Sequence, residues 1–290
     1  MDVKPQSFSP DNPLRQPVAR HDEPQGEPQG KNEDQRGSFA VFLLQLLGAV
    51  LIFRTIIFSP FTIPSESMVP RLVNGDYLLA AKWPYGISAN SLPFRLPLPE
   101  GRLFASMPKR GDIVIFKHPV DGTDYIKRVI GLPGDSVAVV QGRVVLNGRP
   151  LPLARASDFE IALSPNTACA WGGSEVLRAD GGKVCRYLRF TESLPGGRRH
   201  DVVDFGPSGA DNFAPVTVPQ GAMFVMGDNR DNSQDSRFPA AAGFGVGMVP
   251  MDKLVGRAAI IAWSTDGSAE WLKPWTWFSA ARWERIGVRL

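Results

Sequence analysis

Histidine is scarce in this chain of 290 residues, and its scarcity argues against several kinds of catalysis. A Ser-His-Asp triad needs a histidine that an acid holds and that faces a serine. The three histidines fit this poorly: His21 lies in a Pro-rich polar stretch, His118 precedes Pro119 at a predicted strand end, and His200 lies in an Arg-rich segment. No HExxH motif or histidine cluster occurs either. We therefore expect no metal site and no cofactor.

Cysteine is equally scarce, with Cys169 and Cys185 alone in the chain. They form no CxxC motif and have no histidine at zinc spacing, which argues against a structural zinc site. In an oxidising compartment the two could form a disulfide; otherwise they are buried free thiols. The residues themselves leave both alternatives open.

An excess of charge is also absent, because the formal net charge is only +3 and no nucleic-acid-binding motif occurs. We therefore expect no nucleic-acid partner. The chain has 29 glycines and 26 prolines, few helix-period runs, and a hydrophobic fraction of 43% that is ample for a core. This composition favours a loop-rich, mainly β protein.

The N-terminal region combines a polar tail with one long apolar run. Residues 1–37 are rich in proline and polar side chains, which predicts a disordered tail. Residues 38–58 are mainly apolar and contain one charged residue, Arg54, near one end; about 20 such residues span a bilayer. We expect a single transmembrane anchor there. A cleaved signal peptide is the alternative, but the preceding tail is long and no small-x-small site follows.

The rest of the chain predicts strands separated by turns. Apolar or alternating runs occur at 76–80, 113–116, 125–130, 136–140, 143–146, 222–226 and 254–263. We expect an antiparallel β-sheet catalytic domain formed by residues 59–135 and 220–265, with an inserted β-rich lobe at 136–219. Within that lobe, residues 150–215 show no regular pattern. Residues 266–290 form a basic tail rich in tryptophan, which suits either a membrane interface or ordinary core packing.

Two serines stand just after the apolar run, in the stretch 63–70 with the sequence IPSESMVP. Pro64 and Pro70 exclude a regular helix there. An extended backbone would place the Ser65 and Ser67 hydroxyls on the same side. One hydroxyl could then attack a substrate while the other stabilises the oxyanion. A Ser-rich turn without chemistry is the alternative.

A lysine is the remaining candidate base. Lys127 lies in the predicted strand 125–130, where alternation places it on the same face as Tyr125 and Val129. Burial disfavours the charged ammonium, and a neutral lysine can take a proton from a serine. The alternative is a strand lysine whose amine reaches water.

Three long motifs occur in one order behind the apolar run: IPSESMVPRLVNGDYLLAAKWPYG at 63–86, KRGDIVIFKHPVDGTDYIKRVIGLPGD at 109–135 and GDNRDNSQDSR at 227–237. Together they resemble the bacterial type I signal peptidases. The resemblance implies that Ser67 is the nucleophile, Lys127 the general base, and Ser65 with the Ser67 N–H the oxyanion hole. It also implies that Ser233 orients the lysine amine. The resemblance further implies a structural ion pair between Asp235 and Arg237. It also implies a shallow substrate pocket formed by Ile63, Met68, Leu72, Tyr125 and Ile126.

The resemblance also implies what the chain does and where. It implies cleavage of signal peptides from exported preproteins after small residues, of the Ala-x-Ala type, through an acyl-enzyme. It places the enzyme in the bacterial inner membrane with a single pass and with the catalytic domain on the outer face, where a Cys169–Cys185 disulfide is plausible. Glu66 departs from the small residue of many members, although strand alternation points it away from the two serines. The segment 238–250 is longer than usual. Two alternatives are a self-cleaving repressor-type Ser-Lys protease, which should be soluble and bind DNA, and a membrane-tethered β domain that binds exported chains without cutting them.

Overall fold

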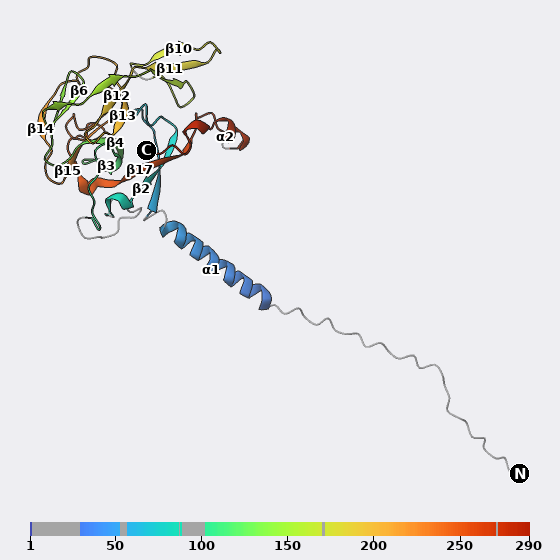
Figure 1. Cartoon of the computed structure of the whole chain (residues 1–290). Helices are drawn as coiled ribbons and strands as arrows, with labels where there is room; N and C mark the ends of the chain where they lie inside the picture. The colour runs from blue at the N-terminus through green and yellow to red at the C-terminus, as the bar shows by residue number, and fades with distance from the viewer. Residues whose placement is uncertain (2–29, 53–56, 87, 89–101, 170–171, 271) are drawn as a thin grey trace. The chain divides into compact units, whose positions relative to one another are not determined.

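The structure is a computed structural model that describes residues 1, 30–52, 57–86, 88, 102–169, 172–270 and 272–290. The chain divides into two units, Met1–Gly48 and Ala49–Leu290. The first contains most of helix α1 (Gly30–Ile52), and the second contains the β-sheets (Figure 1).

Helix α1 begins inside the segment predicted to be a disordered tail and ends before the predicted anchor does. Residues 2–29 of that tail and residues 53–56 of the anchor lie outside the described residues. Within the part of the chain that the structure describes, no helix is both long enough and apolar enough to cross a membrane. The predicted transmembrane helix over 38–58 is therefore not confirmed.

An antiparallel sheet of seven strands dominates the second unit. Its spatial order is β1-β2-β17-β3-β4-β15-β16. The strands are β1 (Phe58–Thr62), β2 (Asp76–Ala81), β3 (Ile113–Lys117), β4 (Asp124–Gly131), β15 (Ala222–Met226), β16 (Val249–Pro250) and β17 (Leu254–Ser264). Pro60 and Pro250 lie on the two edge strands, where a residue without an N–H is tolerated.

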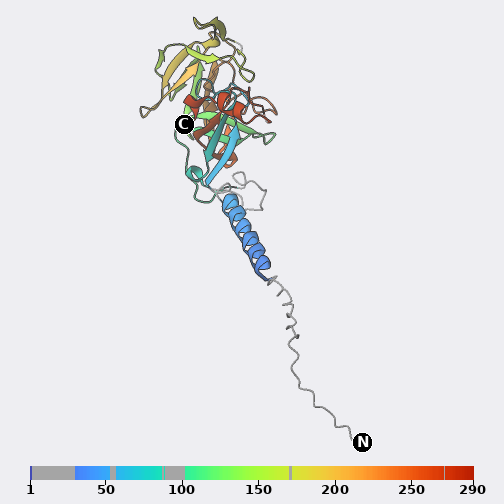
Figure 2. The ribbon, with the colours of Figure 1, turned by 90° about the vertical axis from the view of Figure 1, so that its right-hand side faces the viewer.

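Three smaller antiparallel sheets lie between β4 and β15 in the sequence, with the orders β14-β5-β6-β7, β13-β12-β8 and β10-β11-β9. In Figures 1 and 2 these strands, coloured green to gold, gather above the seven-stranded sheet. Their bounds are β5 (Ser136–Val140), β6 (Arg143–Leu146), β7 (Arg149–Pro150), β8 (Leu153–Arg155), β9 (Phe159–Ala162), β10 (Ser174–Leu177), β11 (Lys183–Tyr187), β12 (Arg189–Ser193), β13 (Arg199–Val203) and β14 (Phe213–Thr217).

The central strand β3 of the large sheet is buried on both faces, and it is apolar at consecutive positions. On β3, Ile113 and Ile115 pack into one cluster with Leu78, whereas Val114 and Phe116 pack into another. Side chains alternate along a strand, so the two clusters lie on opposite faces of β3. A third cluster fills the space beneath β5 and β6, and a fourth lies under β11. The predicted mainly β, antiparallel fold is confirmed.

The strand predictions agree with the structure wherever the pattern is apolar, and the 136–146 stretch forms the predicted hairpin of β5 and β6. Strands β8 to β14 lie in the part of the expected β-rich lobe where the sequence shows no regular pattern. These strands are short and partly exposed, so they carry no long apolar run. Cys169 and Cys185 are joined by a disulfide in this region, with their Cα atoms 5.1 Å apart.

The C-terminal residues pack along the large sheet rather than trailing from it. They form α2 (Trp275–Ser279) and the short 3-10 helix η5 (Trp283–Arg285); two further 3-10 helices, η2 (Trp83–Tyr85) and η4 (Met251–Lys253), flank the sheet. Arg285 forms an ion pair of 2.6 Å with the fully buried Asp76. Trp275 and Trp283 nevertheless keep 68% and 55% of their surface exposed, so they do not belong to the core. Trp271 lies outside the described residues.

Candidate active site

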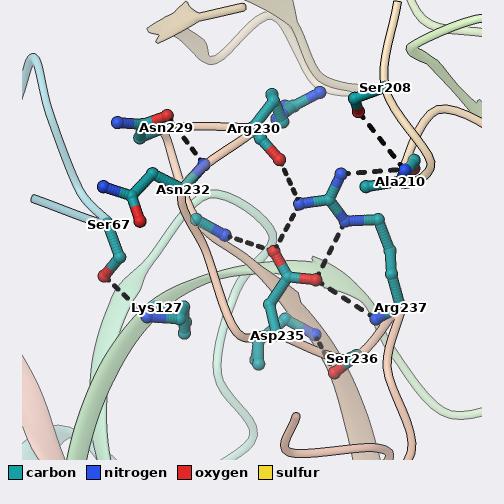
Figure 3. Close-up of polar contacts among 12 residues, drawn as sticks. Ser67, Lys127, Ser208, Ala210, Asn229, Arg230, Asn232, Asp235, Ser236 and Arg237 are labelled. Carbon is teal, nitrogen blue, oxygen red and sulfur yellow. Dashed lines mark hydrogen bonds and ion pairs between the residues drawn. The ribbon is translucent and has the colours of Figure 1, made fainter. Parts of the chain in front are cut away.

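Ser67 and Lys127 lie 60 positions apart in the sequence and meet in space. Ser67 lies in the turn between β1 and β2, and Lys127 lies on β4. Nζ of Lys127 is 2.7 Å from Oγ of Ser67, which is hydrogen-bond distance (Figure 3). Both side chains are buried, with exposed fractions of 7% for Ser67 and 3% for Lys127. The arrangement brings a hydroxyl and an amine together in a place that excludes most water.

Burial changes the proton affinity of this amine. It lowers the pKa of Lys127 to about 8, while the Asp235 and Asp228 carboxylates partly oppose the change by attracting the charged form. The nitrogen also lies 5.6 Å from the centre of the Tyr125 ring. A substantial part of the Lys127 population is therefore neutral in mildly alkaline solution and can accept a proton.

The serine pair does not have the extended backbone that the sequence predicted. Residues 65–71 form bends and turns, with the Val69 N–H donating to the Glu66 carbonyl and the Leu72 N–H to the Met68 carbonyl. The prolines that exclude a long helix also exclude the β-ladder that a strand would need. The two hydroxyls still lie together, with Oγ of Ser65 3.4 Å from Oγ of Ser67.

A groove of about 610 Å³ opens at these residues. Of the five predicted pocket residues, Ile63, Tyr125 and Ile126 line it. Met68 and Leu72 do not; they are fully buried in the core cluster that also holds Ile63. The turn explains this correction, because it directs both side chains into the protein and not along an extended edge. The other lining residues are Phe61, Thr62, Pro64, Ser65, Glu66, Ser67, Asn74, Ile115, Asp124, Lys127, Asn232 and Gln234.

The turn also changes the position of the Glu66 side chain. Strand alternation predicted that it points away from both serines, but it lines the groove beside them. Its side chain is half-buried, and burial raises its pKa. The groove thus carries an acid next to the nucleophile.

The polar loop 227–237 lies against the serine turn and holds it in place. The Asn229 N–H donates to the Ser67 carbonyl at 3.1 Å. A Cβ atom on Gly227 would lie 2.5 Å from that same carbonyl oxygen and 2.5 Å from Cβ of Ser233. Only a glycine fits there without a shift of the backbone. Sequence reasoning overlooked both Gly227 and Asn229, although they belong to the GDNRDNSQDSR motif.

Asp235 and Arg237, at the end of this loop, form the predicted ion pair. Two contacts of 2.9 Å join them, and Asp235 also accepts the Gly227 N–H at 3.0 Å (Figure 3). The Arg237 guanidinium in turn donates to the Arg230 carbonyl at 2.6 Å. A buried charge pair satisfied in this way fixes the loop geometry, and loss of either partner leaves an uncompensated charge.

Ser233 is placed differently from its expected role. Among the described residues, its buried hydroxyl has no hydrogen-bond partner, so no hydrogen bond joins it to Lys127. Its Oγ instead faces Gly227, 2.3 Å from where a Cβ atom would be. The lysine amine is directed at Ser67.

Two further buried ion pairs brace the site, and the sequence did not indicate either. Arg128 contacts Asp228 at 2.7 and 2.6 Å, and Arg230 contacts Glu192 of β12 at 2.9 and 2.7 Å. The Glu192 pair joins the smaller sheets to the polar loop. In the part of the chain that the structure describes, no group of three or more metal-ligating side chains comes together.

The comparisons with known proteins bear directly on this site. Residues 36–263 match the family model described as "Signal peptidase, peptidase S26". Signal peptidase I of Rickettsia typhi is 34% identical over 244 residues, which cover 81% of this chain and 82% of the relative. Signal peptidase I of Rickettsia canadensis is 34% identical over 225 residues, with 74% and 75% covered. A solved signal peptidase I from Enterococcus faecalis V583 is 24% identical and covers 52% of this chain and 97% of its own, but its TM-score of 0.27 is too low to support a conclusion.

The match spans most of the chain and includes the serine turn, β4 and the polar loop. The chain belongs to the signal peptidase family S26. The resemblance that the three sequence motifs carry is thereby confirmed.

Proposed function

We propose that the protein is a signal peptidase I that cleaves N-terminal signal peptides from exported preproteins with a Ser67–Lys127 dyad. The observation that carries this proposal is the 2.7 Å contact between the Lys127 amine and the Ser67 hydroxyl in a buried setting. Family membership supports the reaction class, and the groove beside the dyad supports a peptide substrate.

In the first half-reaction, neutral Lys127 takes the proton of Ser67 as Oγ attacks the scissile carbonyl carbon. The carbonyl oxygen becomes an oxyanion, to which the Ser65 hydroxyl and the Ser67 N–H donate. Collapse breaks the C–N bond, and Lys127 gives its proton to the leaving amine of the mature protein. The signal peptide remains as an ester on Ser67.

In the second half-reaction, neutral Lys127 takes a proton from a water molecule, and the hydroxide attacks the ester. Collapse breaks the C–O bond to Ser67, and the proton returns to Oγ from Lys127. The signal peptide leaves with a free carboxylate. Serine and lysine regain their starting protonation states, so the cycle balances.

The groove accounts for the expected substrate preference. An extended peptide would lie between the segment 61–67 and the start of β4, which line its two sides, and would add to the sheet as a strand. Ile63, Tyr125 and Ile126 give an apolar lining. We propose that this lining accepts alanine at positions −1 and −3 of the substrate and excludes larger side chains by their volume.

We further propose that residues 38–58 anchor the enzyme in the bacterial cytoplasmic membrane, with the catalytic domain on the outer face. Apolar side chains of α1 are exposed, with Phe39 at 62% and Leu44 at 68%. The exposed Trp275 and Trp283 would meet the same membrane at its interface. Full-length protein should resist carbonate extraction of membranes, and protease added outside spheroplasts should degrade the catalytic domain. Extraction in carbonate, or protection from the protease, would contradict this arrangement.

The catalytic proposal is tested with purified full-length protein in nonionic detergent and a preprotein substrate. Ser67→Ala and Lys127→Ala should each abolish cleavage, while Ser174→Ala, at an exposed serine on β10 outside the groove, should retain it. Circular dichroism of each variant establishes that it is folded. Cleavage by either dyad variant would overturn the mechanism, and binding of preprotein without cleavage by the wild type would favour a non-enzymatic role.

A further inference from the structure

A second cavity, of about 530 Å³, lies between the large sheet and the smaller sheets. It shares no lining residue with the substrate groove. Arginine dominates its lining, with residues from the serine turn, β4, β12, β13 and β17. The six arginines are Arg71, Arg128, Arg189, Arg198, Arg199 and Arg257, and we call this space the arginine cavity.

Carboxylates compensate only half of these arginines. Arg128 is paired with Asp228 as described above, and Arg198 lies 2.7 Å from Asp112. Arg189 lies 3.2 Å from Asp201. Within the described residues, no carboxylate lies within ion-pair distance of the other three, which are Arg71, Arg199 and Arg257. The cavity therefore keeps an excess of positive charge.

The two acids that line the cavity are already occupied. Asp112 accepts hydrogen bonds from Arg198, from the Tyr85 hydroxyl at 2.9 Å and from the Lys109 N–H at 2.9 Å. Asp201 accepts from Arg189 and, at 2.7 Å, from the Thr191 hydroxyl. Neither can turn to a second guanidinium without leaving one of these donors unpaired, which is unfavourable for a buried group.

Buried polar atoms without partners mark the same place. Within the described residues, Nε of Arg257 has no hydrogen-bond acceptor although it is shielded from water. His200 lines the cavity with an exposed fraction of 8%, and its Nδ1 is also without a partner there. The Arg71 guanidinium donates to the Arg289 backbone carbonyl, and partial burial together with the nearby Arg128 guanidinium lowers the pKa of Arg71. A negatively charged ligand in the cavity would compensate the guanidinium charges that line it.

We propose that the arginine cavity binds an anion that carries phosphate groups. Guanidinium groups match phosphate oxygens in paired hydrogen bonds, and several of them around one space favour a group with many acceptor oxygens. The volume is within the range of small-molecule sites and exceeds what one phosphate fills, so a di- or triphosphate or a phospholipid headgroup fits better. Gly111 helps to shape the site, because a Cβ atom there would lie 2.5 Å from Cδ of Arg198.

The arginine cavity is lined by residues that are close in sequence to the catalytic residues. Arg128 follows Lys127 on β4 and points to the other face of that strand. Arg71 lies in the same turn as Ser67. A bound anion would therefore contact the backbone segments that carry both the base and the nucleophile.

The test is calorimetric titration of the full-length chain in nonionic detergent with tripolyphosphate at constant ionic strength. Saturable binding at one site is expected. Arg71→Gln and Arg199→Gln, which change exposed side chains and should fold normally, should each weaken binding about tenfold, the usual effect of losing a charge-assisted hydrogen bond. Arg143→Gln on β6 removes the same charge outside the cavity and should leave the affinity unchanged.

A parallel titration identifies the source of the phosphate. Dihexanoyl phosphatidylglycerol and dihexanoyl phosphatidylcholine replace tripolyphosphate, both below their micelle concentrations. Binding of the anionic lipid that the two cavity variants weaken supports a lipid headgroup, whereas binding of tripolyphosphate alone supports a soluble phosphate. Absence of saturable binding for all three, or an equal loss in Arg143→Gln, would overturn the proposal. No step of this test depends on peptidase activity, so it is independent of the proposed function.

Discussion

Burial of Lys127 should lower the free energy of unfolding of the protein, and replacing this lysine with methionine should show by how much. The perturbation is Lys127→Met, which keeps the length and most of the apolar volume of the side chain and removes its charge. The pKa of Lys127 falls from 10.5 to about 8 on folding. Each unit corresponds to about 1.4 kcal/mol of difference between the two protonation states. The folded protein therefore bears a penalty of roughly 3 kcal/mol at pH 7, which the variant should recover.

The pH dependence gives this prediction its sign. Below pH 8 the amine is charged in both the folded and the unfolded chain, so the full penalty opposes folding. Between pH 8 and 10.5 the folded chain has released its proton while the unfolded chain still holds one, so wild-type stability rises with pH. The advantage of Lys127→Met should thus shrink from roughly 3 kcal/mol at pH 7 to about 1 kcal/mol at pH 10.

Urea unfolding at pH 7, 8.5 and 10 measures these differences. Lys183→Met serves as the matched control, because Lys183 is an exposed lysine on β11 and its replacement should change stability by less than about 0.5 kcal/mol at every pH. A variant that is no more stable than the wild type at pH 7, or a gain that does not vary with pH, would refute the argument that burial makes this amine a base.

Three further predictions concern the same site. The log of kcat/KM for preprotein cleavage should fall by one unit for each pH unit below about 8, as Lys127 takes up a proton; a flat profile down to pH 6 would argue against a lysine base. Asp235→Asn should lower the free energy of unfolding by about 3–5 kcal/mol in urea titrations, because it leaves Arg237 buried and uncompensated; wild-type stability would contradict this. Gly227→Ala should reduce kcat at least about tenfold, since its Cβ atom displaces the Ser67 carbonyl, whereas Gly209→Ala, where the space is open, should have no effect in the same assay.

The sequence predicted the large sheet well for a physical reason. Strands β3, β15 and most of β17 are covered on both faces, so each is a run of mainly apolar residues, whereas β4 interrupts its apolar run with Lys127 and Arg128. Strand β10 is largely exposed and β12 is only partly buried, and they include Glu175, Arg189 and Glu192, so no such run marks them. Their pairing is decided by tertiary contacts, which no local pattern contains.

The residues of the candidate site also fall into those that the sequence predicted and those that it did not. Ser67 and Lys127 were found because chemistry requires those two residue types, and the motifs identified which serine and which lysine to choose. Glu66 was placed wrongly because the stretch was taken as extended, and its turn is held by the Asn229 N–H of the polar loop; Met68 and Leu72 were expected in the pocket from the family resemblance alone. The bracing pair Arg230–Glu192 could not be foreseen, because its partners are 38 positions apart and Glu192 lies in a strand without a pattern.

That ion pair has a consequence for how the chain can be altered. Shortening the enzyme by removing residues 136–219 and closing the gap would delete Glu192 and leave Arg230 as an isolated cation inside the protein. It would also remove the Val203 N–H and carbonyl, which bond the backbone of Asp228 and Arg230. The polar loop 227–237 thus depends on the smaller sheets for its contacts. A shortened enzyme would have to provide this loop with a new carboxylate and a new strand.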